Sequence, residues 1–156
     1  SLLIGRRSND SGDDLWIQPP IEGAPAQPYA TAPFDQVYGA ISPGGRSLAY
    51  ASNESGQFDI YLDGFPKPGS RVRVTTAGGT EPRWGADGRE LFFRRGTEIH
   101  AVALDGFEVR STVRLFDAGG ALRAFDVGRD GRFLLNLPAT NHAPAAATIV
   151  NHWTAR

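Results

Sequence analysis

Several groups of residues in this 156-residue chain have the side chains and the spacing that chemistry requires. The run Gly45-Arg46-Ser47-Leu48-Ala49 comes close to Gly-x-Ser-x-Gly, the sharp turn that exposes a nucleophilic serine in α/β hydrolases. The run Asn9-Asp10-Ser11-Gly12-Asp13-Asp14 gathers the oxygen ligands that calcium prefers. His100, His142 and His152 carry imidazoles of the kind that bind zinc. Whether any of these groups forms a site depends on the elements that hold it.

An internal repeat with a spacing of 43 residues indicates what those elements are. Three segments align without gaps: Gly45-Arg46-Ser47-Leu48, Gly88-Arg89-Glu90-Leu91 and Gly131-Arg132-Phe133-Leu134. A weaker copy opens the chain, because Asp14-Leu15-Trp16-Ile17 resembles Asp59-Ile60-Tyr61-Leu62. A period in the low forties, with strand-forming residues between turns, is typical of the four-stranded blades of β-propellers.

Each copy reads as short strands joined by tight turns, and no stretch has the periodicity of a helix. Glycine and proline, 19 and 11 residues in all, recur at these turns. Leu91-Phe92-Phe93 and Phe133-Leu134-Leu135 are consecutive apolar residues on short strands, which predicts burial on both faces of each strand. The sequence therefore predicts an all-β fold, a partial β-propeller with about three and a half blades of four antiparallel strands.

The repeat also predicts where the blades begin and end. The first, incomplete blade takes residues 1–31, the second 34–76, the third 77–118 and the fourth, C-terminal blade 119–156. The first copy lacks its innermost strand and the fourth stops after its third. A closed propeller usually has at least four blades, so we expect a piece of a longer propeller or one part of an assembly of copies.

The repeat resembles the TolB-type, WD40-like propeller repeat. In that family it runs Phe-Ser-Pro-Asp-Gly-Arg-x-Leu-Ala-Tyr, followed by a Ser-Asn-x-x-Gly turn and an Ile-Tyr strand. Here the same positions hold Ile41-Ser42-Pro43-Gly44-Gly45-Arg46-Ser47-Leu48-Ala49-Tyr50, then Ser52-Asn53-Glu54-Ser55-Gly56 and Ile60-Tyr61-Leu62. The third copy and the ending Thr148-Ile149-Val150-Asn151-His152-Trp153-Thr154 are similar to the C-terminal propellers of bacterial proteins, many with an N-terminal serine/threonine kinase domain. That likeness predicts that Arg156 lies near a natural C-terminus.

The resemblance implies a fold and a setting, but no catalytic residue. This chain departs from the family pattern at Gly44, where the family has Asp, and at Gly85, where it has Ser. Both changes affect turns. None of the kinase motifs is in the chain, so no catalytic role is carried over. The resemblance also suggests an extracytoplasmic or periplasmic location, which the residues themselves leave open.

The repeat gives the candidate nucleophile and the histidines a structural interpretation. Ser47 begins a strand, and Glu90 and Phe133 take its place in the other copies, which a nucleophile would not explain. His100 occupies the position of Tyr61, which favours a packing role. The three histidines share no metal-ligand spacing. We therefore expect no catalytic residue, no metal site and no cofactor.

The acidic run and two glycosylation sequons are interpreted as turns. Asn9-Asp10-Ser11 and Asn53-Glu54-Ser55 occupy equivalent positions of the repeat, where asparagine and serine suit turn geometry. The second copy of the turn keeps one of the three acids of the first. Solvated Asx turns are thus a better interpretation than calcium ligation.

Charge and composition limit the partners. Sixteen basic against seventeen acidic residues leave a formal charge of −1, which argues against nucleic acid. A local basic face could form from arginines that end equivalent strands, Arg6-Arg7 and Arg94-Arg95, together with Arg71, Arg73, Arg83 and Arg89. Arginines also pair with carboxylates between blades, however. No apolar run is long enough to insert into a membrane. The absence of cysteine excludes disulfides and thiolate sites.

The predicted function is non-enzymatic. Propellers bind partners where loops from several blades converge, and glycines let a partner approach the backbone of the loops before the inner strands. These loops are residues 34–37, 77–81 and 118–122, and the candidate binding residues are Gly78, Gly79, Thr80, Glu81, Gly119 and Gly120. Ordinary connectors between blades are the alternative interpretation of these loops. We expect a binding scaffold or sensor segment of a larger bacterial protein, with a protein or peptide partner. Two alternatives are regulation of an upstream kinase or peptidase and closure of a ring by homo-oligomerisation.

Overall fold

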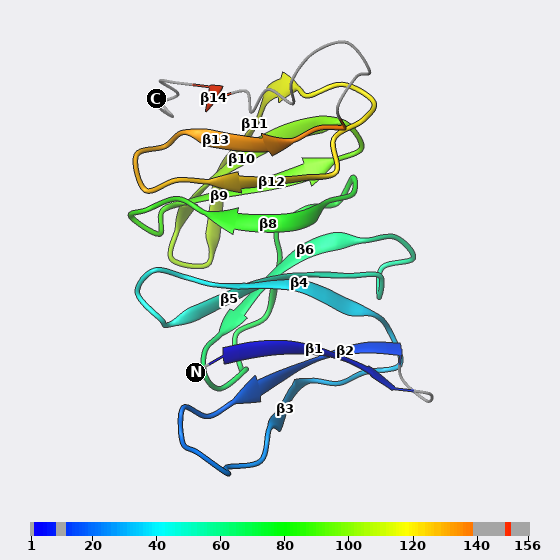
Figure 1. The fold of residues 1–156 in the computed structure, drawn as a ribbon, viewed down its shortest axis with the longest axis vertical. Coiled ribbons are helices and arrows are strands. Elements are labelled where there is room, and N and C mark those ends of the chain that lie inside the picture. Colours follow the sequence, from blue (N-terminus) through cyan, green and yellow to red (C-terminus); the bar gives the residue numbers. More distant parts are fainter. Residues whose placement is uncertain (1, 9–11, 139–148, 151–156) are drawn as a thin grey trace. The chain divides into compact units, whose positions relative to one another are not determined.

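The computed structural model describes residues 2–8, 12–138 and 149–150, and all regular structure among them is β-strand (Figure 1). The strands are β1 (Leu2–Ser8), β2 (Gly12–Gln18), β3 (Gln27–Ala30), β4 (Gln36–Ile41), β5 (Ser47–Ser52), β6 (Asp59–Gly64), β7 (Val72–Arg73), β8 (Thr80–Trp84), β9 (Glu90–Arg95), β10 (Glu98–Asp105), β11 (Glu108–Asp117), β12 (Ala124–Val127), β13 (Phe133–Asn136) and β14 (Ile149–Val150). The predicted all-β class is confirmed. Over the described ranges there is no helix that could cross a membrane.

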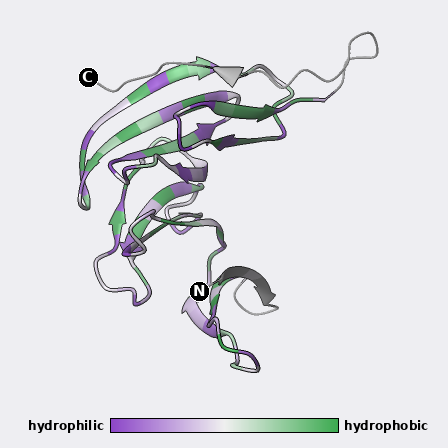
Figure 2. Cartoon of the chain, turned by 60° about the vertical axis from the view of Figure 1, so that its left-hand side comes forward, coloured by the Kyte–Doolittle hydropathy of each residue, from purple (hydrophilic) through white to green (hydrophobic). Residues whose placement is uncertain are grey.

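The strands form four antiparallel sheets in which each strand pairs with its neighbour in sequence. The orders are β1-β2-β3, β4-β5-β6-β7, β8-β9-β10-β11 and β12-β13-β14. Short turns allow this simple meander, and a meander of four strands is the unit of a propeller blade. Figure 2 shows hydrophobic and hydrophilic residues alternating along these strands, as expected where each strand has two distinct faces.

The chain divides into two compact units, residues 1–82 and 83–156. In the N-terminal unit a core forms between the first two sheets. Leu15 and Tyr29 come from the first sheet, and Leu48, Tyr50 and Tyr61 from the second. All five are less than 9 % exposed, and each such side chain contributes roughly 1.5–3 kcal/mol when it leaves water.

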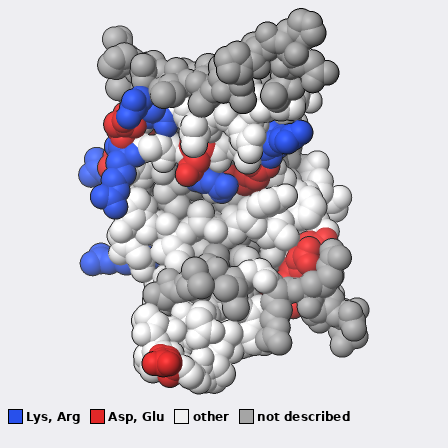
Figure 3. Space-filling view, viewed as in Figure 1, with Lys and Arg blue, Asp and Glu red and all other residues white. Residues whose placement is uncertain are grey.

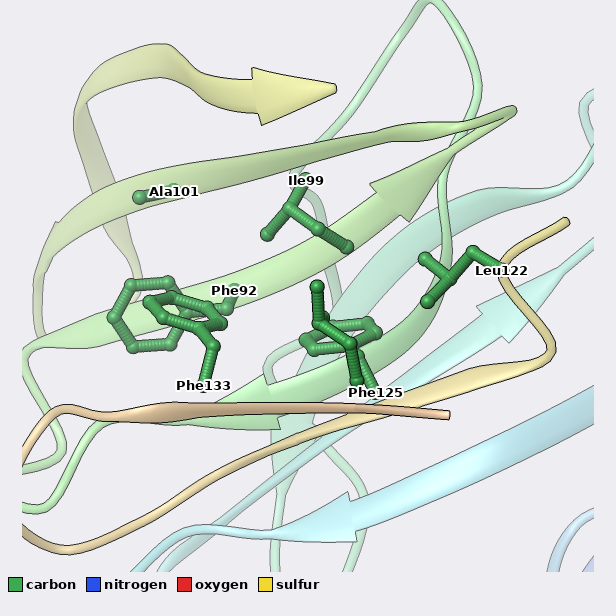
Figure 4. Close-up of a cluster of buried hydrophobic side chains, with 7 residues drawn as sticks. Phe92, Ile99, Ala101, Leu122, Phe125 and Phe133 are labelled. Atoms are coloured by element: carbon green, nitrogen blue, oxygen red, sulfur yellow. The ribbon is translucent and has the colours of Figure 1, made fainter. Parts of the chain in front are cut away.

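In the C-terminal unit the core lies between the third and fourth sheets (Figure 4). Phe133 of β13 meets Phe92 of β9 edge to face at 5.0 Å and Phe116 of β11 at 5.4 Å. On β9, Leu91, Phe92 and Phe93 are exposed by 0 %, 3 % and 0 %. The prediction that this strand is buried on both faces is therefore confirmed.

The fourth copy departs from the gapless repeat by one residue. Each hairpin between the first two strands is closed by the N–H of one residue and the C=O of another: Ser42 and Ser47, Gly85 and Glu90, Gly128 and Arg132. The first two pairs are five residues apart and the third is four. Because side chains alternate between faces, a shift of one residue turns the whole strand over. Phe133, not Leu134, is thus the structural counterpart of Leu48 and Leu91.

This shift makes one prediction wrong. The run Phe133-Leu134-Leu135 was expected to be buried on both faces, but Leu134 is 55 % exposed while Phe133 and Leu135 are 1 % and 6 % exposed. Phe133 and Leu135 pack toward the third sheet. Leu134 is the counterpart of Phe92, which the fourth sheet covers. No described side chain covers Leu134 in the same way.

A strained residue recurs on the first strand of the second and third sheets. Tyr38 and Glu81 have φ angles of 57° and 54°, a left-handed conformation that non-glycine residues rarely adopt. In β4 this conformation forms a bulge, since Val37 pairs with Ala51 and the next paired residue is Ala40, opposite Ala49. Because the feature repeats with unlike side chains, it serves the bend of the blade and not a chemical role.

Candidate binding site

An open hollow of about 510 Å³ lies in the N-terminal unit. Its lining comes from the connection before β4, the β5–β6 turn, β6, and the segment that leads into and forms β7: Phe34, Glu54, Ser55, Tyr61, Arg71 and Arg73. Tyr61 is 3 % exposed and Phe34 is 41 % exposed. The hollow thus combines a buried phenol, an exposed aromatic ring, a hydroxyl and two guanidinium groups.

Turn length explains why the second blade has this hollow. Six residues, 53–58, connect β5 to β6, whereas two residues, Gly96 and Thr97, connect β9 to β10 in the third blade. The longer turn supplies Glu54 and Ser55. The tight hairpin of the third blade has no residues at those positions. The longer turn thus distinguishes the second blade from the third.

Asp59 organises one side of the hollow. Its side chain is fully buried, at 0 % exposure, and accepts hydrogen bonds from Ser55 Oγ at 2.7 Å, Arg73 Nη2 at 2.6 Å, Thr75 Oγ1 at 2.9 Å and the Gly78 N–H at 2.9 Å. Burial alone would raise the pKa of Asp59, but these donors outweigh it and hold the pKa below its usual value. The carboxylate stays ionised and fixes both Ser55 and Arg73.

Arg71 is positioned by the loop that precedes it. Asp63 Oδ1 accepts the N–H groups of Gly64, Gly69 and Ser70 at 2.7, 2.8 and 3.0 Å, which folds this loop back onto the end of β6. Arg71 Nη2 then reaches Glu54 Oε1 at 2.7 Å. Its guanidinium carbon lies 5.4 Å from the centroid of the Tyr61 ring, within the range of a cation–π contact.

The acids of the hollow are more buried than its arginines. Glu54 and Asp59 side chains are 14 % and 0 % exposed, against 48 % and 37 % for Arg71 and Arg73. A ligand that enters from solvent meets the guanidinium groups first. The arrangement therefore favours an anion or a hydrogen-bond acceptor.

The lining residues do not form a nucleophile and base. Ser55 Oγ lies 2.7 Å from Asp59 Oδ2 and 3.0 Å from the Gln57 carbonyl, and its single proton is donated to one of these two acceptors. A carboxylate whose pKa is held below its usual value is a poor base for taking the serine proton near neutral pH. Among the residues that line the hollow, Ser55 therefore has no base beside it that suits this role.

The structure places the first set of predicted binding residues beside this hollow. Gly78 donates to Asp59, and Gly79 donates to the Phe58 carbonyl at 2.8 Å. Gly78 and Thr80 are half-buried, whereas Gly79 and Glu81 are buried. The loop is thus held against the β6 side of the blade through the same carboxylate that holds Arg73.

The second predicted set, Gly119 and Gly120, belongs to the C-terminal unit and is exposed. Asp117 Oδ1 accepts the Gly119 N–H at 2.9 Å, and this bond lowers the pKa of Asp117. Gly119 has a φ of 80°, so the turn requires glycine there. Neither residue lines the hollow described above.

The other chemical candidates lie in turns and strands. Ser47 begins β5 and donates its N–H to Ser42 Oγ at 3.1 Å, within a hairpin. Asn53 Oδ1 accepts the Asp35 N–H at 2.9 Å and its Nδ2 donates to Asp35 Oδ2 at 3.0 Å, so the side chain ties the turn to the connection before β4 instead of forming an Asx turn. Within the turn, the Asn53 carbonyl accepts the Gly56 N–H at 2.9 Å. His100 is 5 % exposed and stacks on Phe93 at 5.2 Å, which confirms its packing role.

Metal ligation was also considered for the acidic run and the histidines. Asn9, Asp10, Ser11, His142 and His152 lie outside the described residues. Among the residues that are described, no three His, Cys, Asp or Glu side chains are grouped so that they could hold a metal ion.

The sequence pointed to parts of this site without assembling them. Arg71 and Arg73 were noted as part of a basic face, and Tyr61 as core, but nothing joined them to Phe34 or Glu54. The available signal was the Arg-x-Arg spacing on a strand, which places both side chains on one face. Because Arg73 pairs with Tyr61 on the neighbouring strand, the arginine side chains lie on the same face of the sheet as Tyr61.

The acid–arginine pair of this blade has a counterpart in the third. Arg114 of β11 binds Glu98 of β10 at 2.5 Å, and the registers His100↔Arg114 and Tyr61↔Arg73 are equivalent. Glu98 is 33 % exposed, unlike its buried counterpart. Figure 3 shows such mixing more widely, because acidic and basic side chains lie next to each other on the face in view.

Comparison with solved structures shows the fold. The chain is similar to the tricorn protease structure (TM-score 0.53, 13 % identity, 86 % of this chain and 15 % of that one). It is also similar to oligogalacturonate lyase from Vibrio parahaemolyticus (TM-score 0.52, 13 % identity, 86 % and 36 % coverage). TolB from Acinetobacter baumannii also matches, with a TM-score of 0.45, 16 % identity, and 96 % and 49 % coverage. No protein-family model matches the sequence, and neither does any curated protein.

The first two structures are β-propeller proteins, so the predicted partial propeller is confirmed. At the level of the fold, this agrees with the propeller that the repeat predicts. The chain spans about a seventh and about a third of the lengths of these two proteins. Both also carry names of enzymes, and identities this low transfer no activity to the present chain.

Proposed function

We propose that this chain is a non-enzymatic propeller segment that binds a protein or peptide partner through the hollow in its second blade. The observation that carries the proposal is the pair of half-exposed guanidinium groups, Arg71 and Arg73, held in place by buried carboxylates beside an exposed Phe34. Arginine and aromatic residues are the side chains that dominate binding energy at protein interfaces. The remaining contacts of the hollow serve to keep them fixed.

Two features support binding rather than catalysis. The hydroxyl of Ser55 has no neighbouring base suited to activate it, as derived above. The hollow is formed by a loop that differs between copies of the repeat, and differing loops on a rigid scaffold are where binding specificity usually resides. A propeller that spans part of a larger ring is suited to act as a scaffold or sensor segment.

A random peptide library displayed on phage tests the proposal. Peptides enriched on the wild-type chain are measured against Phe34→Ala and Arg71→Gln. Arg110→Gln is the matched control, because Arg110 is also half-exposed (53 %) and ion-paired, but lies on β11 away from the hollow's lining. We expect the enriched peptides to lose binding to the first two variants and to keep it with the control.

Equal binding of the enriched peptides to all four proteins would refute the hollow as the binding site. Turnover of any substrate that depends on Ser55 would refute the non-enzymatic proposal. Circular dichroism of each variant separates a loss of binding from a loss of folding.

A second candidate function is ring completion by a second copy of the chain, and Leu134 favours it. This leucine is 55 % exposed, whereas its counterparts Ala49 and Phe92 are 0 % and 3 % exposed. The surface that covers Phe92 is another sheet of the same repeat. A further blade is therefore the surface with the right shape and apolar character to cover Leu134.

The mass in solution tests this candidate. Ring completion by two copies predicts a particle of about twice 16.8 kDa. Leu134→Glu should then yield a monomer with unchanged secondary structure. A wild-type chain that stays monomeric at all concentrations would refute self-assembly.

A further inference from the structure

We propose that the hollow recognises a carboxylate side chain in an acidic peptide segment, bound between Arg71 and Arg73 with an apolar neighbour against Phe34. This inference rests on the proposed function and adds the chemical class of the ligand. It follows from which donors are occupied, which groups are exposed and how much charge the hollow already holds.

Two nitrogens of the Arg73 guanidinium are bound to other groups of the protein. Its Nη2 binds Asp59 at 2.6 Å and its Nε binds the Thr75 carbonyl at 3.0 Å. Among the described residues its Nη1 group has no partner, although a guanidinium has five N–H donors in all. The group lines the hollow with its orientation already fixed by two bonds. A ligand oxygen that binds Nη1 therefore needs no costly ordering of this side chain.

Arg71 is held in a fixed position and stays charged. One edge of its guanidinium is held by Glu54, and its plane is held near the Tyr61 ring. Tyr50 and Glu54 raise the pKa of Arg71 despite its partial burial, so it stays charged at all relevant pH values. Arg71 directly precedes β7 and Arg73 ends it, so their Cα atoms are about 7 Å apart in an extended chain, and both side chains line the same hollow. A carboxylate is small enough to bridge them.

The net charge of the hollow limits the charge of its ligand. Two guanidinium groups face two carboxylates, Glu54 and Asp59, so the hollow is close to neutral as a whole. A doubly charged phosphate would be poorly balanced there, whereas one carboxylate adds a single charge at the exposed, arginine side. The same balance disfavours a nucleic-acid backbone, which needs a run of uncompensated positive charge.

The length of the strand at the edge of the sheet limits how a peptide can bind. β7 has only two residues, so its free edge is too short for a peptide to add as a stable strand. Recognition therefore falls to side chains. Phe34 is 41 % exposed at the rim of the hollow and offers an apolar contact beside the arginines. An acidic residue flanked by aromatic residues matches both features.

Three labelled heptapeptides test the inference by fluorescence anisotropy: Gly-Ser-Phe-Glu-Phe-Ser-Gly, the same peptide with Gln in place of Glu, and the same peptide with phosphoserine in that place. We expect the Glu peptide to bind at least about tenfold more tightly than the Gln peptide, because its contacts are charge-assisted. We also expect added salt to weaken binding of the Glu peptide.

Variants locate the effect. Arg71→Gln should abolish the difference between the Glu and Gln peptides, while Arg71→Lys should keep part of it, since lysine retains the charge but not the planar donor set. Arg110→Gln, which changes a comparable exposed ion pair on β11, should leave the difference intact. Arg73 is left unchanged in this test because it neutralises the buried Asp59.

The outcomes separate this inference from the proposed function. Peptides from the phage library that need Arg71 and Phe34 but bind equally with Glu or Gln would overturn the carboxylate and leave the binding site standing. Tighter binding of the phosphoserine peptide would overturn the argument from charge. Failure of the library to yield any peptide that depends on the hollow would overturn both.

Discussion

Asp59→Asn should destabilise the N-terminal unit much more than Glu98→Gln destabilises the C-terminal unit. The two residues hold equivalent positions of the repeat, and each binds an arginine on the next strand, Arg73 or Arg114. They differ mainly in burial, with side-chain exposures of 0 % and 33 %. They also differ in their other partners, because Glu98 Oε2 lies 3.0 Å from His100 Nε2, while Asp59 accepts further bonds from Ser55, Thr75 and Gly78. The comparison therefore contrasts a buried, fully bonded carboxylate with a partly exposed one at the equivalent position.

The magnitude follows from the partners that each change leaves behind. Asp59 accepts bonds from Ser55, Arg73, Thr75 and Gly78 within 2.9 Å. Asparagine keeps one acceptor oxygen, and its NH₂ group would face donors at the other position. Asp59 is buried but Arg73 is 37 % exposed, so the loss should fall below the roughly 3–5 kcal/mol of a fully buried pair. A buried donor left without an acceptor costs about 1–3 kcal/mol, whereas an exposed ion pair contributes about 0–1 kcal/mol.

Urea denaturation followed by tryptophan fluorescence measures both free energies of unfolding. Trp16 lies in the N-terminal unit and Trp84 in the C-terminal unit, so single-tryptophan variants report on each. The pH dependence adds a second readout. Because the folded-state pKa of Asp59 lies below its usual value, its stabilisation is present above the unfolded pKa of about 3.9 and is lost as the pH falls through the folded value.

Asp59→Asn should remove that part of the acid-induced loss of stability. Equal losses for Asp59→Asn and Glu98→Gln at neutral pH would refute the reasoning, because burial would then not distinguish the pairs. If Asp59→Asn lost as much stability at acid pH as the wild-type chain does, the assigned pKa shift would be wrong.

Three further predictions test particular residues. Gly45 has a φ of 66° and Gly44 an ordinary φ, and no atom lies near a Cβ added at either position. In urea denaturation, Gly45→Ala should therefore lower the free energy of unfolding by about 1–2 kcal/mol, and Gly44→Ala should leave it unchanged or raise it. Burial raises the pKa of Tyr50 to about 12, so ultraviolet titration should show fewer phenols ionising near pH 10 in the folded chain than in urea. The free energy of unfolding should also fall as the pH rises above about 10. Equal numbers of phenols ionising near pH 10 in both conditions would contradict this. Phe133→Ala should cost about 3–5 kcal/mol and Leu134→Ala about 0.5 kcal/mol or less, and the reverse order would contradict the one-residue shift in the fourth copy.

The sequence was sufficient for the fold because the repeat carries it. Gly45, Gly88 and Gly131 all adopt positive φ at the same hairpin, and a requirement of this kind is visible as a recurring glycine. The apolar run on β9 likewise predicted burial on both faces. What the gapless spacing could not indicate was the shorter hairpin at Gly128, since Gly131 and Arg132 kept their places in the alignment while the strand after them turned over.

The site was less predictable, because its residues share no motif. Asp59 recurs in the repeat as an acid, but its burial depends on the Thr75 and Gly78 contacts that form only when the chain folds back. Phe34 and Arg71 are 37 residues apart and meet only through the tertiary structure. The loop at Gly78, singled out from the sequence, donates to Asp59, which also binds Arg73 of the hollow. That this loop binds a partner stays a prediction.

The contrast between the second and third blades links the repeat to the proposed function. Both blades keep an acid and an arginine on their third and fourth strands, so this pair belongs to the scaffold. The second blade adds a six-residue turn, which brings Glu54 against Arg71 and buries Asp59 beneath Ser55. One longer turn thus converts a structural ion pair into the wall of a hollow. If this reasoning is correct, shortening residues 53–58 to the two-residue Gly-Thr turn of the third blade should abolish peptide binding while the sheet β4–β7 still forms; peptide binding that survives the shortened turn would mean that the arginines act without the loop.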